Sequence, residues 1–161
     1  MRLYILRHGD AVESPFYQDY DRPLSDLGKR QIQAVAHFFQ IAREKPDLIL
    51  TSPLVRAQQT SDLVRENLGV DESLTTDRLV SGGNLRDLIK EIDAHDVARM
   101  LVVGHEPQLS GLISILTGGD EQFRVEMKKA SLACLEVRHP VKKGHAVLAW
   151  LLSSSVLTMI R

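Results

Sequence analysis

The sequence has little cysteine and no long apolar run. Its 161 residues include a single cysteine, Cys134, so an internal disulfide is excluded. Cys134 lies in an apolar segment, residues 130–137, where a thiol behaves as a small core side chain. The first apolar run, residues 3–6, is too short for a signal-peptide core, and no run reaches the length of a membrane span. These absences predict a protein of the reducing cytoplasm that makes no use of a membrane.

An excess of charge of either sign is also missing. Lys and Arg number 20, Asp and Glu number 21, and the formal net charge is -1. Without a general positive field, nucleic acid and anionic membrane surfaces are not expected partners, and any anion site must be local. The sequence is 43% hydrophobic and 25% charged, as globular proteins are, and it contains no repeat or linker-like tract. We expect one domain over residues 1–161, and a monomer.

Short apolar runs alternate with helical patterns along the chain, which indicates an α/β fold. The runs at residues 3–6, 48–51 and 100–103 predict buried strands of a parallel sheet. Two later runs, residues 130–137 and 146–152, predict an antiparallel pair of strands. We therefore expect a three-layer α/β/α domain with a mainly parallel central sheet and helices on both faces.

Residues that begin or end helices divide the helical patterns into four segments. In chain order they are Ser25 as a first N-cap, Ser52-Pro53 as a second start with Gly69 as its stop, Asn84 as a third N-cap, and Pro107 as a fourth start with Gly118 or Gly119 as its stop.

Three polar segments each follow directly after a predicted strand. They are Arg7-His8-Gly9, Thr51-Ser52-Pro53 and Gly104-His105-Glu106. In open α/β sheets this edge is where ligands bind. Two of the three segments also begin helices, whose free N–H groups and positive dipole end favour phosphate. The three segments are thus expected to meet around one anion.

The residue types at this edge suit phosphoryl transfer. Arginine neutralises phosphoryl oxygens through paired hydrogen bonds, and Arg7 and Arg56 are placed to reach one crevice. A neutral histidine has a lone pair that can attack phosphorus, and His8 is placed to do so. Gly9 allows a sharp turn beside the ligand, and His105 can donate to a phosphoryl oxygen.

These segments resemble the motifs of the histidine phosphatase superfamily. Arg7-His8-Gly9 resembles its RHG motif, residues 52–60 (SPLVRAQQT) its SPxxRAxQT motif, and Gly104-His105 its GHxP-like motif. Residues 21–25 (DRPLS), followed by Gly28, look like the DRPLT-x-x-G element of the SixA-type phosphohistidine phosphatases. The resemblance covers residues 2 to about 116, and it implies the phosphoglycerate-mutase-like version of the expected fold.

The resemblance also implies roles for individual residues. His8 would be the phosphorylated nucleophile, and Arg7, Arg56 and His105 would complete the phosphate pocket. The expected substrate-binding residues are Arg7, Gly9, Arg22, Ser52, Arg56, His105 and Glu106. We predict no metal and no other cofactor, because the flanking arginines repel a cation.

The identity of a general acid stays open at this stage. Glu106 follows His105 and can reach the site as an acid, or it can serve only as a first-turn helix residue. A phosphohistidine needs less acid assistance than a phosphate ester, because its leaving imidazole can already carry a proton on the other nitrogen. The chain has no inserted loop that would supply another carboxylate.

Three functions are compatible with these residues. We expect a phosphohistidine phosphatase that acts on a protein such as a phosphotransfer domain. The first alternative is a small-molecule phosphomonoesterase with Glu106 as acid. The second is a phosphohistidine-binding regulatory module without turnover.

Overall fold

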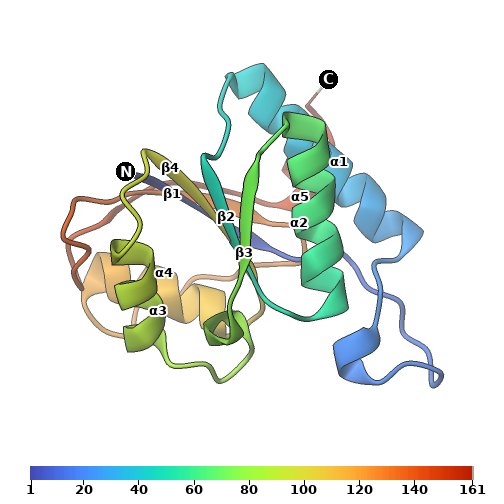
Figure 1. Cartoon of the computed structure of the whole chain (residues 1–161), viewed down its shortest axis with the longest axis horizontal. Coiled ribbons are helices and arrows are strands. Elements are labelled where there is room, and N and C mark those ends of the chain that lie inside the picture. The colour runs from blue at the N-terminus through green and yellow to red at the C-terminus, as the bar shows by residue number, and fades with distance from the viewer. Residues whose placement is uncertain (161) are drawn as a thin grey trace.

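A six-stranded sheet forms the centre of the molecule in the computed structural model, which describes residues 1–160 (Figure 1). The strands are β1 (Arg2–Arg7), β2 (Leu48–Thr51), β3 (Glu72–Thr75), β4 (Arg99–Gly104), β5 (Leu132–Glu136) and β6 (Val147–Leu152). The helices are α1 (Asp26–Ala42), α2 (Val55–Leu68), α3 (Leu85–Asp93), α4 (Gln108–Gly118) and α5 (Ser154–Leu157), with 3-10 turns at Asp19–Asp21 and Asp77–Leu79.

The strand order β3-β2-β4-β1-β5-β6 places the parallel strands side by side. β1 and β2 both pair in parallel with β4, whereas β5 runs antiparallel to β1 and β6 antiparallel to β5. Arg7 pairs with Gly104, and Thr51 pairs with Val103. The predicted mainly parallel sheet is confirmed, and its register brings the three polar segments to one edge.

Strand alternation builds two cores, one on each face of the sheet. In β1, Leu3 and Ile5 belong to the core that α3 and α4 cover, and Tyr4 and Leu6 to the core that α1, α2 and α5 cover. All four β1 side chains are fully or almost fully buried. The expected three layers are therefore present (Figure 1).

Most of the expected helix boundaries are confirmed. The Ser25 hydroxyl accepts the N–H of Gly28 at 3.0 Å and begins α1. The Asn84 side chain accepts two N–H groups at the start of α3. Gly69 and Gly119 end α2 and α4 with positive φ angles of 62° and 88°, which glycine adopts without strain.

The predicted start of the second helix at Ser52-Pro53 is wrong. α2 begins at Val55, with Leu54 as its N-cap residue. The backbone N–H of Ser52 donates to Val103 at 3.0 Å, so Ser52 extends the contact between β2 and β4 instead of entering the helix. Arg56 consequently lies in the first turn of α2, close to the sheet edge.

Two short elements had no expectation from the sequence. β3 is an edge strand whose four residues are all exposed, so it has no apolar run to reveal it. α5 is a single turn that packs on α1. Cys134 is 3% exposed in the core, as expected, and burial raises the pKa of its thiol to about 11. None of the helices within residues 1–160 is long and apolar enough to cross a membrane.

Candidate active site

His8 lies at the carboxyl end of β1 and is only 5% exposed. Its Nδ1 lies 2.7 Å from the carbonyl oxygen of Gly9. A carbonyl only accepts hydrogen bonds, so Nδ1 carries the proton and the lone pair resides on Nε2. The Nε–H of Arg56 donates to this Nε2 at 3.3 Å. The imidazole is thus held as one tautomer, and its Nε2 lone pair accepts from the Arg56 guanidinium.

His105 lies beside His8, with the two ring centroids 4.9 Å apart. Its Nε2 is 2.7 Å from the hydroxyl of Ser52, which also accepts the N–H of Leu54 at 3.3 Å. The Nδ1 of His105 is buried and has no hydrogen-bond partner among the described residues. The Ser52 hydroxyl can donate to Nε2, which leaves Nδ1–H as an unused donor.

Arg7 and Arg56 bring positive charge to both imidazoles. Arg7 donates from Nη1 to the carbonyl of Met127 at 2.8 Å, and its buried Nε has no partner within residues 1–160. Burial is the main cause that lowers the pKa of His8 to about 3. The hydrogen bond to Gly9 opposes this shift, and the charges of His105, Arg56 and Arg7 add to it. Burial, then the charge of Arg56, lowers the pKa of His105 to about 4. Both rings are neutral at pH 7.

Thr60 fixes the backbone on which His8 depends. The Thr60 hydroxyl donates to the carbonyl of Arg56 at 2.7 Å and accepts the N–H of Gly9 at 3.2 Å. It therefore links α2 to Gly9, the residue whose carbonyl holds Nδ1 of His8. No local sequence pattern reveals this contact, because the Gly9 partner lies 51 positions away.

Gly28 of the DRPLS-x-x-G element and Gly9 lie where two backbone segments pack too closely for a Cβ atom. A Cβ on Gly28 would come within 2.0 Å of the Asp10 carbonyl oxygen, and one on Gly9 within 2.8 Å of the Gly28 carbonyl oxygen. The first turn of α1 therefore packs directly on the segment after His8. Ser25 donates to the Asp10 carboxylate at 2.6 Å, and Lys129 pairs with the same carboxylate at 2.8 Å.

Asp19 is a site residue that the sequence reasoning missed. Its carbonyl oxygen accepts from Nη1 of Arg56 at 2.6 Å, and its carboxylate lies 3.2 Å from Nη2 of Arg56. Arg22 reaches the same carboxylate at 3.2 Å and the Val12 carbonyl at 2.9 Å. Partial burial raises the pKa of Asp19, but Arg56 and Arg22 outweigh it and hold the pKa below its ordinary value. The Asp19 carboxylate thus occupies Nη2 of Arg56, and the Asp19 backbone carbonyl occupies Nη1.

Arg22 and Glu106 lie at the margin of this cluster. Arg22 is joined to Arg56 only through Asp19 and makes no hydrogen bond to either histidine among the described residues. The Glu106 carboxylate accepts the N–H of Ser110 at 3.0 Å, so it serves the first turn of α4. The geometry of Glu106 matches the helix-start interpretation.

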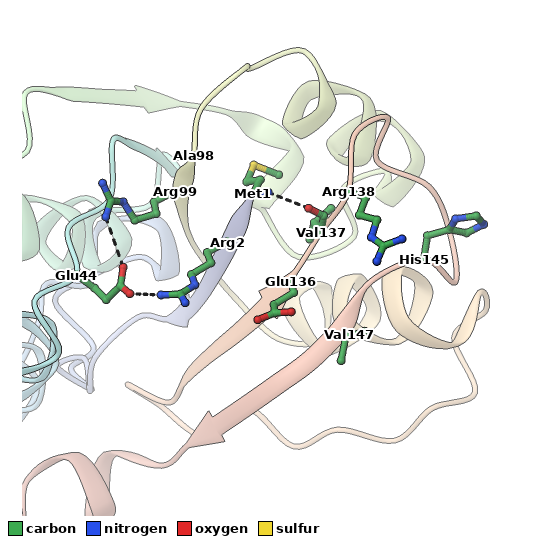
Figure 2. Close-up of a pocket in the computed structure, with 10 residues that line it drawn as sticks. All are labelled: Met1, Arg2, Glu44, Ala98, Arg99, Glu136, Val137, Arg138, His145 and Val147. Atoms are coloured by element: carbon green, nitrogen blue, oxygen red, sulfur yellow. Dashed lines mark hydrogen bonds and ion pairs between the residues drawn. The ribbon is translucent and has the colours of Figure 1, made fainter.

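A cavity of about 710 Å³ opens at the opposite edge of the sheet, where the parallel strands begin (Figure 2). Glu44 pairs there with Arg2 and with Arg99. This cavity shares no residue with the His8 cluster and has no part in the chemistry considered below.

Comparison with known proteins identifies the family. Residues 3–80 match the family model described as the histidine phosphatase superfamily (branch 1). An uncharacterised protein of Picosynechococcus sp. is 32% identical over 136 residues, which covers 82% of each chain. The phosphohistidine phosphatase SixA of Escherichia coli is 24% identical over 165 residues, which covers 100% of this chain and 99% of SixA.

Solved structures agree with the sequence matches. The structure of the protein histidine phosphatase SixA complexed with tungstate superposes with a TM-score of 0.87 at 24% identity, covering 96% of this chain and 98% of that one. The α-ribazole phosphatase of Shigella flexneri shares the fold, with a TM-score of 0.75 at 20% identity over 96% and 97% of the two chains.

The chain therefore belongs to the histidine phosphatase superfamily, and it is a phosphatase. Within that class it is similar to SixA along its whole length, which confirms the family suggested by the sequence motifs.

Proposed function

We propose that the chain is a phosphohistidine phosphatase that transfers the phosphoryl group to His8 and then to water. In the first step Nε2 of His8 attacks phosphorus, and the bond between phosphorus and the substrate imidazole breaks. The electron pair leaves with the substrate nitrogen. In the second step water attacks phospho-His8, the P–N bond breaks, and phosphate and neutral His8 are restored.

The tautomer of His8 is the observation that carries this proposal. A nucleophile needs a lone pair at neutral pH and a fixed direction of attack. Nδ1–H is held on the Gly9 carbonyl at 2.7 Å, so the lone pair resides on the nitrogen that faces Arg56. The pKa of about 3 keeps that nitrogen unprotonated.

The donors around His8 support stabilisation of the phosphoryl oxygens. Arg56 lies in the first turn of α2, where its guanidinium reaches Nε2 of His8. The Nε–H of Arg7 has no partner among residues 1–160. The unpartnered Nδ1 of His105 is a third donor when Ser52 donates to its Nε2. Fixed donors of this kind stabilise charge in the transition state without reorganisation.

The contacts of Glu106 and Asp19 favour phosphohistidine over a phosphate ester. The Glu106 carboxylate accepts the N–H of Ser110, and two arginines hold the pKa of Asp19 below its ordinary value, so both carboxylates are engaged by groups of the protein itself. An alkoxide leaving group needs a proton donor. The imidazole of phosphohistidine leaves as a neutral ring when its other nitrogen carries a proton. The full-length likeness to SixA points to the same substrate class.

The test compares a phosphohistidine peptide, made with phosphoramidate, and para-nitrophenyl phosphate, without added metal. We expect the wild type to prefer the peptide and His8→Ala to release no phosphate from either substrate. Glu106→Gln serves as the matched variant: loss of ester hydrolysis in this variant, with a wild-type preference for the ester, would identify a phosphomonoesterase. Phosphate binding without turnover of either substrate would identify a binding module.

A further inference from the structure

The connection between β1 and α1 forms a projecting arm, which we define as residues 12–21. In Figure 1 this blue segment stands out from the body of the molecule, beyond the start of α1. It begins four positions after His8, and it includes the 3-10 turn Asp19–Asp21. The arm therefore borders the edge of the sheet at which the phosphoryl group is expected to bind.

The arm displays aromatic side chains to solvent. Phe16 is 92% exposed, Tyr20 is 52% exposed and Tyr17 is 44% exposed. Exposed aromatic residues of this kind, gathered on one segment, are typical of protein contact surfaces, because they supply a large contact area with few rotatable bonds. Within residues 1–160, none of these rings belongs to either core.

Asp19 connects the arm to the phosphate-binding groups. Its carbonyl oxygen and carboxylate contact Arg56 at 2.6 Å and 3.2 Å, and Arg56 contacts His8 at 3.3 Å. Tyr20 follows Asp19 directly in the chain. A macromolecule that inserts a phosphorylated side chain between the arginines must therefore lie against the base of the arm.

The free charges of the arm are negative. Asp19 is paired with two arginines, but Glu13 and Asp21 make no ion pair within residues 1–160 and both are exposed. The surface that meets the arm must match its apolar rings and its two free carboxylates. A surface with apolar side chains and a lysine or arginine satisfies both conditions.

We propose that the arm docks the phosphoprotein substrate, and that it selects a phosphohistidine flanked by apolar and basic residues. This inference rests on the proposed function and deepens it, because it assigns protein recognition to residues outside the phosphate-binding cluster. Phe16 and Tyr20 provide the apolar contact, and Glu13 and Asp21 provide the charge preference.

Two phosphohistidine peptides of equal length test the proposal. One has leucine and lysine on both sides of the phosphohistidine, and the other has serine and glutamate. We expect the wild type to favour the first in kcat/KM. Phe16→Ala or Tyr20→Ala should lower that value at least about fivefold, the effect expected of an aromatic side chain that contributes strongly to an interface. Glu13→Lys is expected to reverse part of the preference between the peptides.

Two controls separate docking from damage to the pocket. Ile41→Ala removes a side chain that is 49% exposed at the far end of α1, and it should leave both peptides unaffected. Inhibition by inorganic phosphate should keep the same Ki, within about twofold, in Phe16→Ala. Equal kcat/KM values for wild type and Phe16→Ala on both peptides would overturn the docking role. A phosphate Ki in Phe16→Ala that changes as much as its kcat/KM would overturn it as well. A wild type that turns over neither peptide overturns the proposed function as well.

Discussion

Removing the negative charge of Asp19 should make the enzyme bind phosphate more tightly. In the free protein the Asp19 carboxylate lies 3.2 Å from Nη2 of Arg56 and 3.2 Å from Nη1 of Arg22. A bound phosphate competes for the same guanidinium of Arg56. Asp19→Asn keeps the size of the side chain and removes the charge, so the competition weakens.

The magnitude follows from the exposure of the pair. The Arg56 side chain is 9% exposed, but that of Asp19 is 69% exposed, so water screens much of the attraction. Ion pairs of this kind contribute about 0.2–1 kcal/mol, which corresponds to a gain in phosphate affinity of up to about fivefold. The backbone carbonyl of Asp19 still accepts from Arg56 in the variant, which is why a larger gain is not expected.

The assay is titration of inorganic phosphate by calorimetry at pH 7, together with its Ki against the peptide substrate. Asp26→Asn is the matched control, because that carboxylate is 90% exposed and is 3.9 Å from Lys29 only. Unchanged or weaker phosphate binding in Asp19→Asn would refute the idea that Asp19 occupies the phosphate-binding face of Arg56.

Three further predictions concern the support of His8. Thr60→Val leaves the N–H of Gly9 unpaired, so it should cost about 1–3 kcal/mol in unfolding free energy and lower kcat. Gly28→Ala forces a Cβ to within 2.0 Å of the Asp10 carbonyl oxygen, so it should destabilise the protein by about 1–3 kcal/mol or more. Folding lowers the pKa of His8 from 6.5 to about 3, so the folded state binds fewer protons than the unfolded state between these values. The unfolding free energy should therefore decrease as the pH is lowered below 6.5, by about 2 kcal/mol at pH 5.

Each of the three has its own control. Thr60→Ser keeps the hydroxyl and should restore kcat, whereas equal loss in both variants would show that the methyl group matters instead. Gly118→Ala meets only Phe123 Cβ at 3.6 Å and should leave the urea midpoint nearly unchanged. In His8→Gln, the decrease in unfolding free energy from pH 7 to pH 5 should be smaller than in the wild type. The same pH dependence of the unfolding free energy in both proteins would contradict the assignment to His8.

Much of the fold followed from short-range patterns. Five of the six strands coincide with apolar runs. β1, β2, β4 and β5 are largely buried, whereas β6 is an edge strand that is only partly buried but still apolar in sequence. β3 was not predicted, because its four residues are all exposed and its pairing with β2 depends on tertiary position alone. The start of α2 was misplaced because the N–H of Ser52 bonds to β4, a partner that no local pattern reveals.

The candidate site was predictable where its residues follow strands. The structure brings His8, Arg56, His105 and Ser52 into direct contact, and Arg7 lies close enough to lower the pKa of both histidines. Asp19 was missed because its contact with Arg56 spans 37 positions and its own surroundings look like an ordinary polar loop. The sequence left two interpretations for Glu106, and its hydrogen bond to Ser110 matches the one in which it serves the first turn of α4.

The most direct test of the central claim is to trap the phosphorylated enzyme. Wild type is mixed with a phosphohistidine peptide labelled with radioactive phosphorus, quenched in alkali within milliseconds, and mapped by mass spectrometry. The account predicts acid-labile, alkali-stable label on His8, absent from His8→Ala. Label on His105 instead, or phosphate release with no labelled enzyme during a single turnover, would contradict it.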